Sequence, residues 1–126
     1  SPYSTALSSW CHKAANSLPL RRDGDGEQAR DLIHVSDICK ANLHVSNLDN
    51  IPSQPIFNVG TGQSVSNNYI LSLFAEKGYI DIDLAPERKG DIKHSCADIS
   101  KLKNTGWSPS VEIKDGVKKL FKFWGI

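Results

Sequence analysis

The chain has 126 residues, 39% of them hydrophobic, which is typical of one soluble globular domain with a modest core. Lys plus Arg number 15 against 14 for Asp plus Glu, so the net charge favours neither nucleic acid nor an acidic membrane surface as a partner. No apolar run is long enough to span a membrane, and the N-terminus carries no signal-peptide pattern, so we expect a cytoplasmic protein with no nucleic-acid or membrane partner.

The N-terminal third predicts a helix followed by a hairpin. Apolar side chains recur at helical spacing over residues 4–17, and Pro19 ends this amphipathic helix. A short strand is expected to begin at Leu20. The turn at Gly24–Gly26 permits positive φ, as a hairpin demands, and residues 32–35 are predicted to return as its second strand.

The middle of the chain predicts a helix and a buried strand. The helix covers roughly residues 36–47, and Ser36 or Asp37 is expected to cap it. Residues 56–59 form a short apolar run, typical of a buried strand, which the turn at Gly60–Gly62 ends.

The remaining elements alternate between helix and strand. Ser66 is the predicted N-cap of a helix that Gly78 ends, and residues 80–84 alternate as a half-buried strand. Asp98 is expected to cap a short helix, and a strongly amphipathic helix begins near residue 113. The elements together predict an α/β fold, a small mixed sheet of short strands with four to five helices.

Four blocks of sequence stand out by their order and spacing. They are Gly24–Asp37, Asn58–Gly62, Arg88–Asp91, and Ala97–Lys101 leading into Gly106–Pro109. In that order they resemble the C-terminal half of the extended short-chain dehydrogenase/reductase family, specifically its nucleotide-sugar 4-epimerases and dehydratases. The UDP-glucose and UDP-N-acetylglucosamine 4-epimerases are the most similar. The resemblance implies the C-terminal, substrate-binding part of an extended Rossmann-type enzyme, without its N-terminal dinucleotide-binding half.

Arg30 and Arg88 are the main candidate substrate-binding residues. Each lies beside a predicted strand, and a planar guanidinium can donate two parallel hydrogen bonds to a phosphate, so both are expected to meet at one cleft and clamp a diphosphate. The resemblance implies the same role for these arginines and a contact between Asp91 and the nucleoside ribose. For each of the three, the alternative interpretation is a surface salt bridge.

The strand before the first turn carries the candidate contacts with the nucleotide base, Arg21 and Asp23. The position of Asp23 is usually aromatic in the resembled family, and that of Arg22 is usually apolar. Because both are charged here, the surface on which a base would stack is lost, and the identity of the base stays open.

We expect no catalytic, cofactor-binding or metal-ligating residue in this chain. The family's glycine turn for NAD and its Tyr-x-x-x-Lys pair are missing, and Gly60–Gly62 is better interpreted as a tight strand-to-helix connection. The four histidines lack ligand spacing and are predicted to be structural. The cysteines, which form no Cys-x-x-Cys pair, are expected to be reduced thiols: Cys11, Cys39 and Cys96.

The resemblance implies an intact NAD-dependent enzyme that oxidises C4 of a UDP-sugar, rotates the keto intermediate and returns the hydride. With no methionine in the chain, residues 1–126 are expected to be a nucleotide-sugar-binding domain cut from a longer protein. Its partners would be a UDP-sugar and the missing N-terminal Rossmann half. A dTDP-sugar 4,6-dehydratase fragment and a non-catalytic or degenerate module remain alternatives. The strand around Ile56 would lack neighbours, which predicts self-association through exposed apolar surface.

Overall fold

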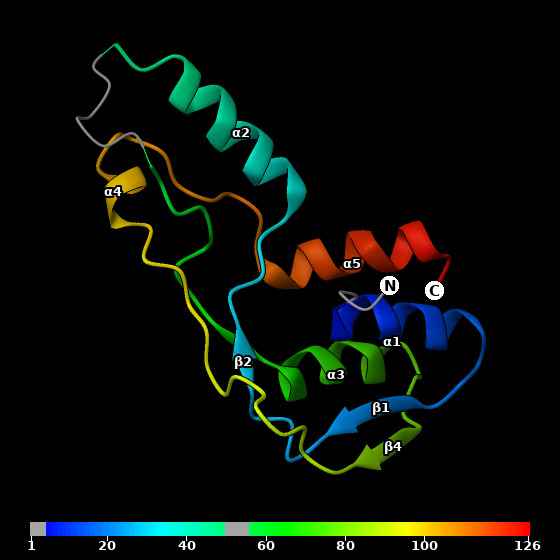
Figure 1. Cartoon of the computed structure of the whole chain (residues 1–126). Coiled ribbons are helices and arrows are strands. Elements are labelled where there is room, and N and C mark those ends of the chain that lie inside the picture. Colours follow the sequence, from blue (N-terminus) through cyan, green and yellow to red (C-terminus); the bar gives the residue numbers. More distant parts are fainter. Residues whose placement is uncertain (1–4, 50–55) are drawn as a thin grey trace.

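The computed structural model describes residues 5–49 and 56–126. Figure 1 shows the helices and strands of these residues in an α/β arrangement, which confirms the predicted class of short strands with four to five helices. The helices are α1 (Ala6–Ala15), α2 (Val35–Ser46), α3 (Asn67–Glu76), α4 (Ser100–Lys103) and α5 (Ile113–Trp124). The strands are β1 (Leu20–Asp23), β2 (Ala29–Arg30), β3 (Val65–Ser66) and β4 (Ile82–Ala85).

The first of two packing regions lies where α1, α3 and α5 gather beside the parallel pair of β1 and β4 (Figure 1). Phe74 is fully buried at its centre, with ring centroids 4.6 Å from Phe121 and 6.2 Å from Trp10. We call this region the aromatic core. Its buried residues are Trp10, Cys11, Ala14, Leu20, Ile70, Leu71, Leu73, Phe74, Val117 and Phe121.

Capping explains where the helices of the aromatic core begin and end. The Thr5 hydroxyl accepts the N–H of Ser8 at the start of α1, and the Ser66 hydroxyl accepts the N–H of Tyr69 at the start of α3, which confirms the predicted cap. Gly125 ends α5 in the left-handed conformation, which glycine adopts without steric cost.

The second region surrounds α2 and α4 and is joined by two carboxylates. We call it the carboxylate-linked half; it comprises residues 31–48, 56–62 and 97–111. Its smaller apolar cluster consists of Ala41, Ile99, Leu102 and Trp107. Asp37, fully buried, accepts the N–H groups of Ser110 and Val111 and the Ser110 hydroxyl at 2.8–3.1 Å. These bonds join α2 to the segment that leads into α5.

Asp31 gathers the loops at the other end of this region. Its carboxylate accepts the N–H groups of Thr61, Gly62 and Ala97 at 2.9–3.2 Å and the Thr61 hydroxyl at 2.6 Å. Burial alone would raise the pKa of Asp31 and of Asp37, but the hydrogen bonds that each accepts outweigh burial and hold both pKa values below the ordinary range.

The predicted hairpin between the first two strands is wrong. Gly24 and Gly26 have the expected positive φ, but β1 pairs in parallel with β4, and β2 pairs antiparallel with β3. The turn instead lies against the start of α3, where Asn68 donates its N–H to the Gly26 carbonyl and its side-chain amide to the Asp25 carbonyl. Partners distant in sequence thus replace the ladder of a hairpin.

The strands predicted at residues 32–35 and 56–59 are absent from the described structure. Leu32 packs against the aromatic core and Ile33 against the carboxylate-linked half, so the chain crosses between the two regions here. Residues 56–59 have no neighbouring strand among the described residues, and a strand without a neighbour forms no ladder.

The predicted cap of α2 also needs correction. Neither Ser36 nor Asp37 occupies the N-cap position; the imidazole Nδ1 of His34 accepts the N–H of Ser36 there. Asp37 is directed to Ser110 and Val111 instead. Helix caps depend on which acceptor the tertiary structure leaves available.

Candidate functional site

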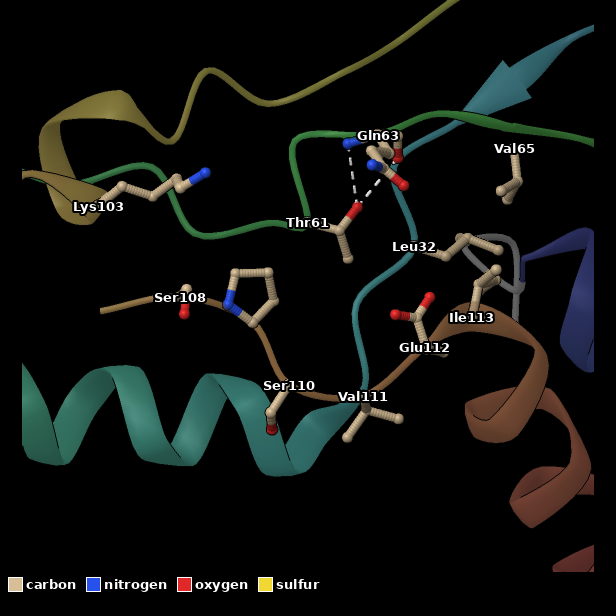
Figure 2. Close-up of a pocket in the computed structure, with 11 residues that line it drawn as sticks. Leu32, Thr61, Gln63, Val65, Lys103, Ser108, Ser110, Val111, Glu112 and Ile113 are labelled. Carbon is tan, nitrogen blue, oxygen red and sulfur yellow. Dashed lines mark hydrogen bonds between the residues drawn. The ribbon is translucent and has the colours of Figure 1, made fainter. Parts of the chain in front are cut away.

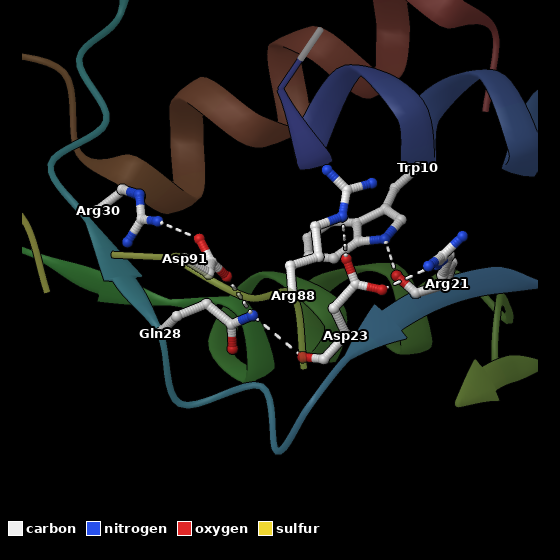
Figure 3. Close-up of polar contacts among 7 residues, drawn as sticks. All are labelled: Trp10, Arg21, Asp23, Gln28, Arg30, Arg88 and Asp91. Atoms are coloured by element: carbon white, nitrogen blue, oxygen red, sulfur yellow. Dashed lines mark hydrogen bonds and ion pairs between the residues drawn. The ribbon is translucent and has the colours of Figure 1, made fainter. Parts of the chain in front are cut away.

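Arg21, Asp23 and Arg88 form a group at the C-terminal end of β1. The Nε of Arg21 lies 2.8 Å from one carboxylate oxygen of Asp23, and the Nε of Arg88 lies 3.0 Å from the other. Figure 3 shows the Asp23 carboxylate between the two guanidinium groups. Arg88 comes from the loop after β4, which pairs with β1 and thereby carries the loop to this position.

Arg30 and Asp91 form the second group of the site. The Nη2 of Arg30, in β2, lies 3.0 Å from a carboxylate oxygen of Asp91. The bridge between Ala29 and His94, with backbone hydrogen bonds from Ala29 to Lys93 and from Ser95 to Ala29, holds the two chain segments together. Residues 61 positions apart in the sequence therefore meet as an ion pair.

Gln28 joins the two groups. Its side-chain amide donates to the backbone carbonyl of Asp23 at 3.0 Å and to the Asp91 carboxylate at 3.4 Å (Figure 3). The side chain is buried although it lies in a polar, glycine-rich turn. All the candidate binding residues, Arg21, Asp23, Arg30, Arg88 and Asp91, therefore belong to one continuous polar network.

Sequence reasoning missed Gln28 because no local pattern marks it. A glutamine in a turn is normally exposed, and its burial results from the packing of distant segments around it. Trp10 belongs to the aromatic core, but its indole N–H also donates to the Arg21 carbonyl at 2.7 Å. The indole N–H of a buried tryptophan needs a hydrogen-bond acceptor, and this requirement is the only sequence signal for such a contact.

Arg30 and Arg88 are accessible to solvent to different degrees. The Arg88 side chain is 70% exposed, and that of Arg30 is 34% exposed, so a ligand can reach Arg88 more freely than Arg30. A guanidinium that faces a carboxylate can exchange it for a phosphate oxygen, since both are anions that accept charge-assisted hydrogen bonds. The network therefore offers two guanidinium groups that can exchange their carboxylate partners for phosphate. Beside them lies the Asp91 carboxylate, which can accept a hydrogen bond from a hydroxyl group.

Two cavities of the described structure lie away from this network. Figure 2 shows one of about 270 Å³, lined by Leu32, Thr61 and Glu112 among others, between the start of α5 and the 61–65 segment. A more open one of about 620 Å³ is lined by Asp31, Phe57 and residues 95–98 among others. Neither of these two cavities is lined by Arg30, Arg88 or Asp91.

The glycine turn at residues 60–62 has a structural role. The N–H groups of Thr61 and Gly62, which could have faced a phosphate, donate to Asp31. A side chain at Gly60 would collide with Ala97 and Asp31, which explains the glycine. The turn is tight, as predicted, but it does not connect a strand to a helix: no strand precedes it among the described residues, and β3 follows it.

Two of the histidines have contacts that are structural. His34 caps α2, and the Nε2 of His44 lies 3.0 Å from the Thr105 carbonyl. Within residues 5–49 and 56–126, no group of three or more His, Cys, Asp or Glu side chains is arranged to hold a metal ion. Cys11, Cys39 and Cys96 are unpaired, and none of the described helices is long and apolar enough to cross a membrane.

Comparison with known proteins gives a consistent match. The family model described as GDP-mannose 4,6 dehydratase matches residues 5–120. CDP-paratose 2-epimerase of Salmonella typhi is 34% identical over 125 residues, which cover 89% of this chain and 36% of that protein.

Two solved structures extend the match to three dimensions. UDP-glucose 4-epimerase of Thermotoga maritima, solved with UDP-glucose, superposes with a TM-score of 0.86 and 29% identity over 99% of this chain and 41% of its own. UDP-glucose 4-epimerase of Thermus thermophilus, solved with NAD, superposes with a TM-score of 0.82 and 25% identity. The match covers 99% of this chain and 42% of the Thermus thermophilus chain.

The match covers only part of these proteins. The chain spans about a third of the length of the curated relatives that it matches and about two fifths of the solved structures. Its fold corresponds to the C-terminal part of Rossmann-type epimerases and dehydratases, as the four sequence blocks predict.

Proposed function

Because this chain belongs to the nucleotide-sugar epimerase and dehydratase family of extended short-chain dehydrogenases/reductases, we propose that it is the UDP-sugar-binding part of an NAD-dependent 4-epimerase. Residues 1–126 act as its nucleotide-sugar-binding domain. The UDP-glucose bound in the Thermotoga maritima relative supports the choice of ligand.

One observation carries the proposal: Arg30, Arg88 and Asp91 lie in one network that the buried Gln28 holds together. In the bound state, Arg30 and Arg88 exchange their carboxylate partners for phosphate oxygens, and each new contact is charge-assisted. Asp91, released from Arg30, accepts a ribose hydroxyl while Gln28 keeps it in position. The proximity of these side chains supports the roles that we propose for them.

The cofactor belongs to another part of the protein. NAD supplies the hydride acceptor in such an enzyme, but the residues described here do not fit it, since the N–H groups of the 60–62 turn are donated to Asp31. The chain has no Tyr-x-x-x-Lys pair either. Its contribution is therefore to hold the nucleotide end of the substrate, not to take part in the redox step.

The N-terminal Rossmann half is the proposed protein partner. Ile56 is 79% exposed, and α2 presents the exposed apolar side chains of Val35 and Leu43. We propose that the Rossmann half covers these side chains. Without that half, the chain should self-associate; a sedimentation profile that stays monomeric at high concentration would contradict this.

Calorimetric titration of the 126-residue chain with UDP and UDP-glucose tests nucleotide binding. We expect Arg88→Gln to weaken UDP binding by roughly tenfold, because a charge-assisted contact with phosphate is lost. Lys89→Gln is the matched control: it removes the same charge from the neighbouring position and should change binding little. Equal losses of affinity in the two variants would show an unspecific effect of charge. If no nucleotide gives a binding heat, the interpretation that remains is a degenerate structural module that binds no nucleotide.

The base and the reaction class need separate titrations. The family model that matches is that of a dehydratase, so a dTDP-sugar 4,6-dehydratase is the second candidate. Binding of dTDP in clear preference to UDP would favour it. The ion pair between Asp23 and Arg88 is the observation that favours a non-catalytic module, because a carboxylate already occupies the arginine.

A further inference from the structure

We propose that Asp23 sets the affinity of the site for diphosphates, because its carboxylate is the internal counter-ion that a diphosphate must displace from Arg88. The inference rests on the proposed function, since it requires Arg88 to bind phosphate.

The two arginines beside Asp23 hold it differently. Arg21 contacts one carboxylate oxygen at 2.8 Å through a hydrogen bond that is also an ion pair. Arg88 contacts the other oxygen at 3.0 Å as an ion pair, and its side chain is 70% exposed, against 48% for that of Arg21. Arg88 is thus the partner that can leave, while Asp23 stays with Arg21.

The fixed position of Asp23 has two consequences for a bound diphosphate. Arg88 must first give up its carboxylate, which costs the free energy of that ion pair. The carboxylate then remains close to the ligand, and its like charge opposes the phosphate. Arg21 reduces this repulsion because it keeps one oxygen of Asp23 paired.

The ion pair between Arg30 and Asp91 differs from the one between Arg88 and Asp23. Asp91, which faces Arg30, also accepts a hydrogen bond from Gln28 and is assigned to the ribose. Its removal would therefore delete a ligand contact, and its effect on affinity would be mixed. The base contact expected of the strand that carries Asp23 runs through its backbone, so substitution of the Asp23 carboxylate isolates the cost of displacement.

The size of the effect follows from the exposure of Arg88. Ion pairs of solvent-exposed arginines are weak, so removing the charge of Asp23 should tighten UDP binding by about two- to fivefold at low salt. The gain should shrink as salt is added, because exposed charges are screened.

A double-mutant cycle tests the proposal. UDP affinity is measured by calorimetry for the 126-residue chain and its Asp23→Asn, Arg88→Gln and double variants, with far-UV circular dichroism as the check of folding. Asp23→Ser provides a second variant without the charge. Asp25→Asn, an exposed position in the adjoining turn, is the control for a general change of charge.

The expected result is a gain from Asp23→Asn that is lost in the Arg88→Gln background and is absent from Asp25→Asn. A gain of equal size in that background, or in Asp25→Asn, would overturn the inference as a general charge effect. If the parent chain binds UDP and neither Asp23 variant binds it more tightly, the inference fails while the proposed function stands. If no variant binds UDP, the proposed function fails and the inference with it.

Discussion

The aromatic core and the carboxylate-linked half are stabilised by different forces. In the aromatic core, helices bury apolar faces around Phe74, and the hydrophobic effect that drives this has no directional requirement. In the carboxylate-linked half, Asp31 and Asp37 collect N–H groups from loops, and each bond requires a donor at a defined place. The first region is therefore specified by a pattern of residues, and the second by individual side chains.

The two regions also differ in their response to pH. Burial raises the pKa of the Cys11 thiol in the aromatic core to about 11, so it stays neutral at ordinary pH. Asp31 and Asp37 stay ionised instead, because the hydrogen bonds they accept favour the charged form. The carboxylate-linked half thus depends on charges that acid removes.

The largest effect is expected from Phe74→Ala in the aromatic core. The ring is fully buried and touches Trp10, Tyr79 and Phe121, so its removal leaves a cavity and should lower the free energy of unfolding by about 3–5 kcal/mol. Urea denaturation followed by tryptophan fluorescence measures the loss. Phe123→Ala is the control, since Phe123 is 83% exposed and should cost little; similar losses in both variants would contradict the assignment of the core.

A smaller and more local effect is expected from Asp37→Asn. The amide offers one acceptor and places its N–H₂ group against the donors of Ser110 and Val111, which should cost about 2 kcal/mol. Hydrogen exchange should accelerate first at these two backbone amides. Asp83→Asn on the exposed side of β4 serves as the comparison. Uniform acceleration throughout α3 and α5 would show that the two regions unfold together.

The smallest effect is expected from a change of pH on the unmodified chain. The pKa values of Asp31 and Asp37 are lower in the folded state, so their contribution to stability is complete above the unfolded value of about 3.9 and is lost as the pH falls through the folded value.

Hydrogen-exchange protection factors measure this acid response. Between about pH 6 and about pH 3, protection at the amides of Thr61 and Ser110 should fall more steeply than at that of Phe74. Protection that falls equally at all three sites would argue against separate anchoring of the two regions by charge.

The helices were predictable because their signals are local. Ser66 caps α3 as expected, and the apolar stripe near residue 113 does form α5. The strands were predicted less well, because a strand is defined by its neighbour. The run of residues 32–35 has strand-like side chains, but it crosses between two packing regions and forms no ladder.

The sequence identified which residues belong to the candidate site, but not which of them contact one another. Arg30, Arg88 and Asp91 stand in recognisable motifs and lie in one polar network, and their binding roles stay a prediction. Gln28 and the pairing of Asp23 with Arg88 lie outside any motif, because they result from segments far apart in the sequence.

By itself, the sequence determined the family, the α/β class, the places of the helices and the arginines proposed to face the ligand. These follow from periodicity, from capping residues and from the order of short motifs, all of which are local properties of the chain. Only the tertiary structure decided which strands pair, that Asp31 and Asp37 fasten loops, and that Asp23 neutralises Arg88. Each of these depends on groups brought together from distant segments, so the free energy of such contacts cannot be inferred from any one segment alone.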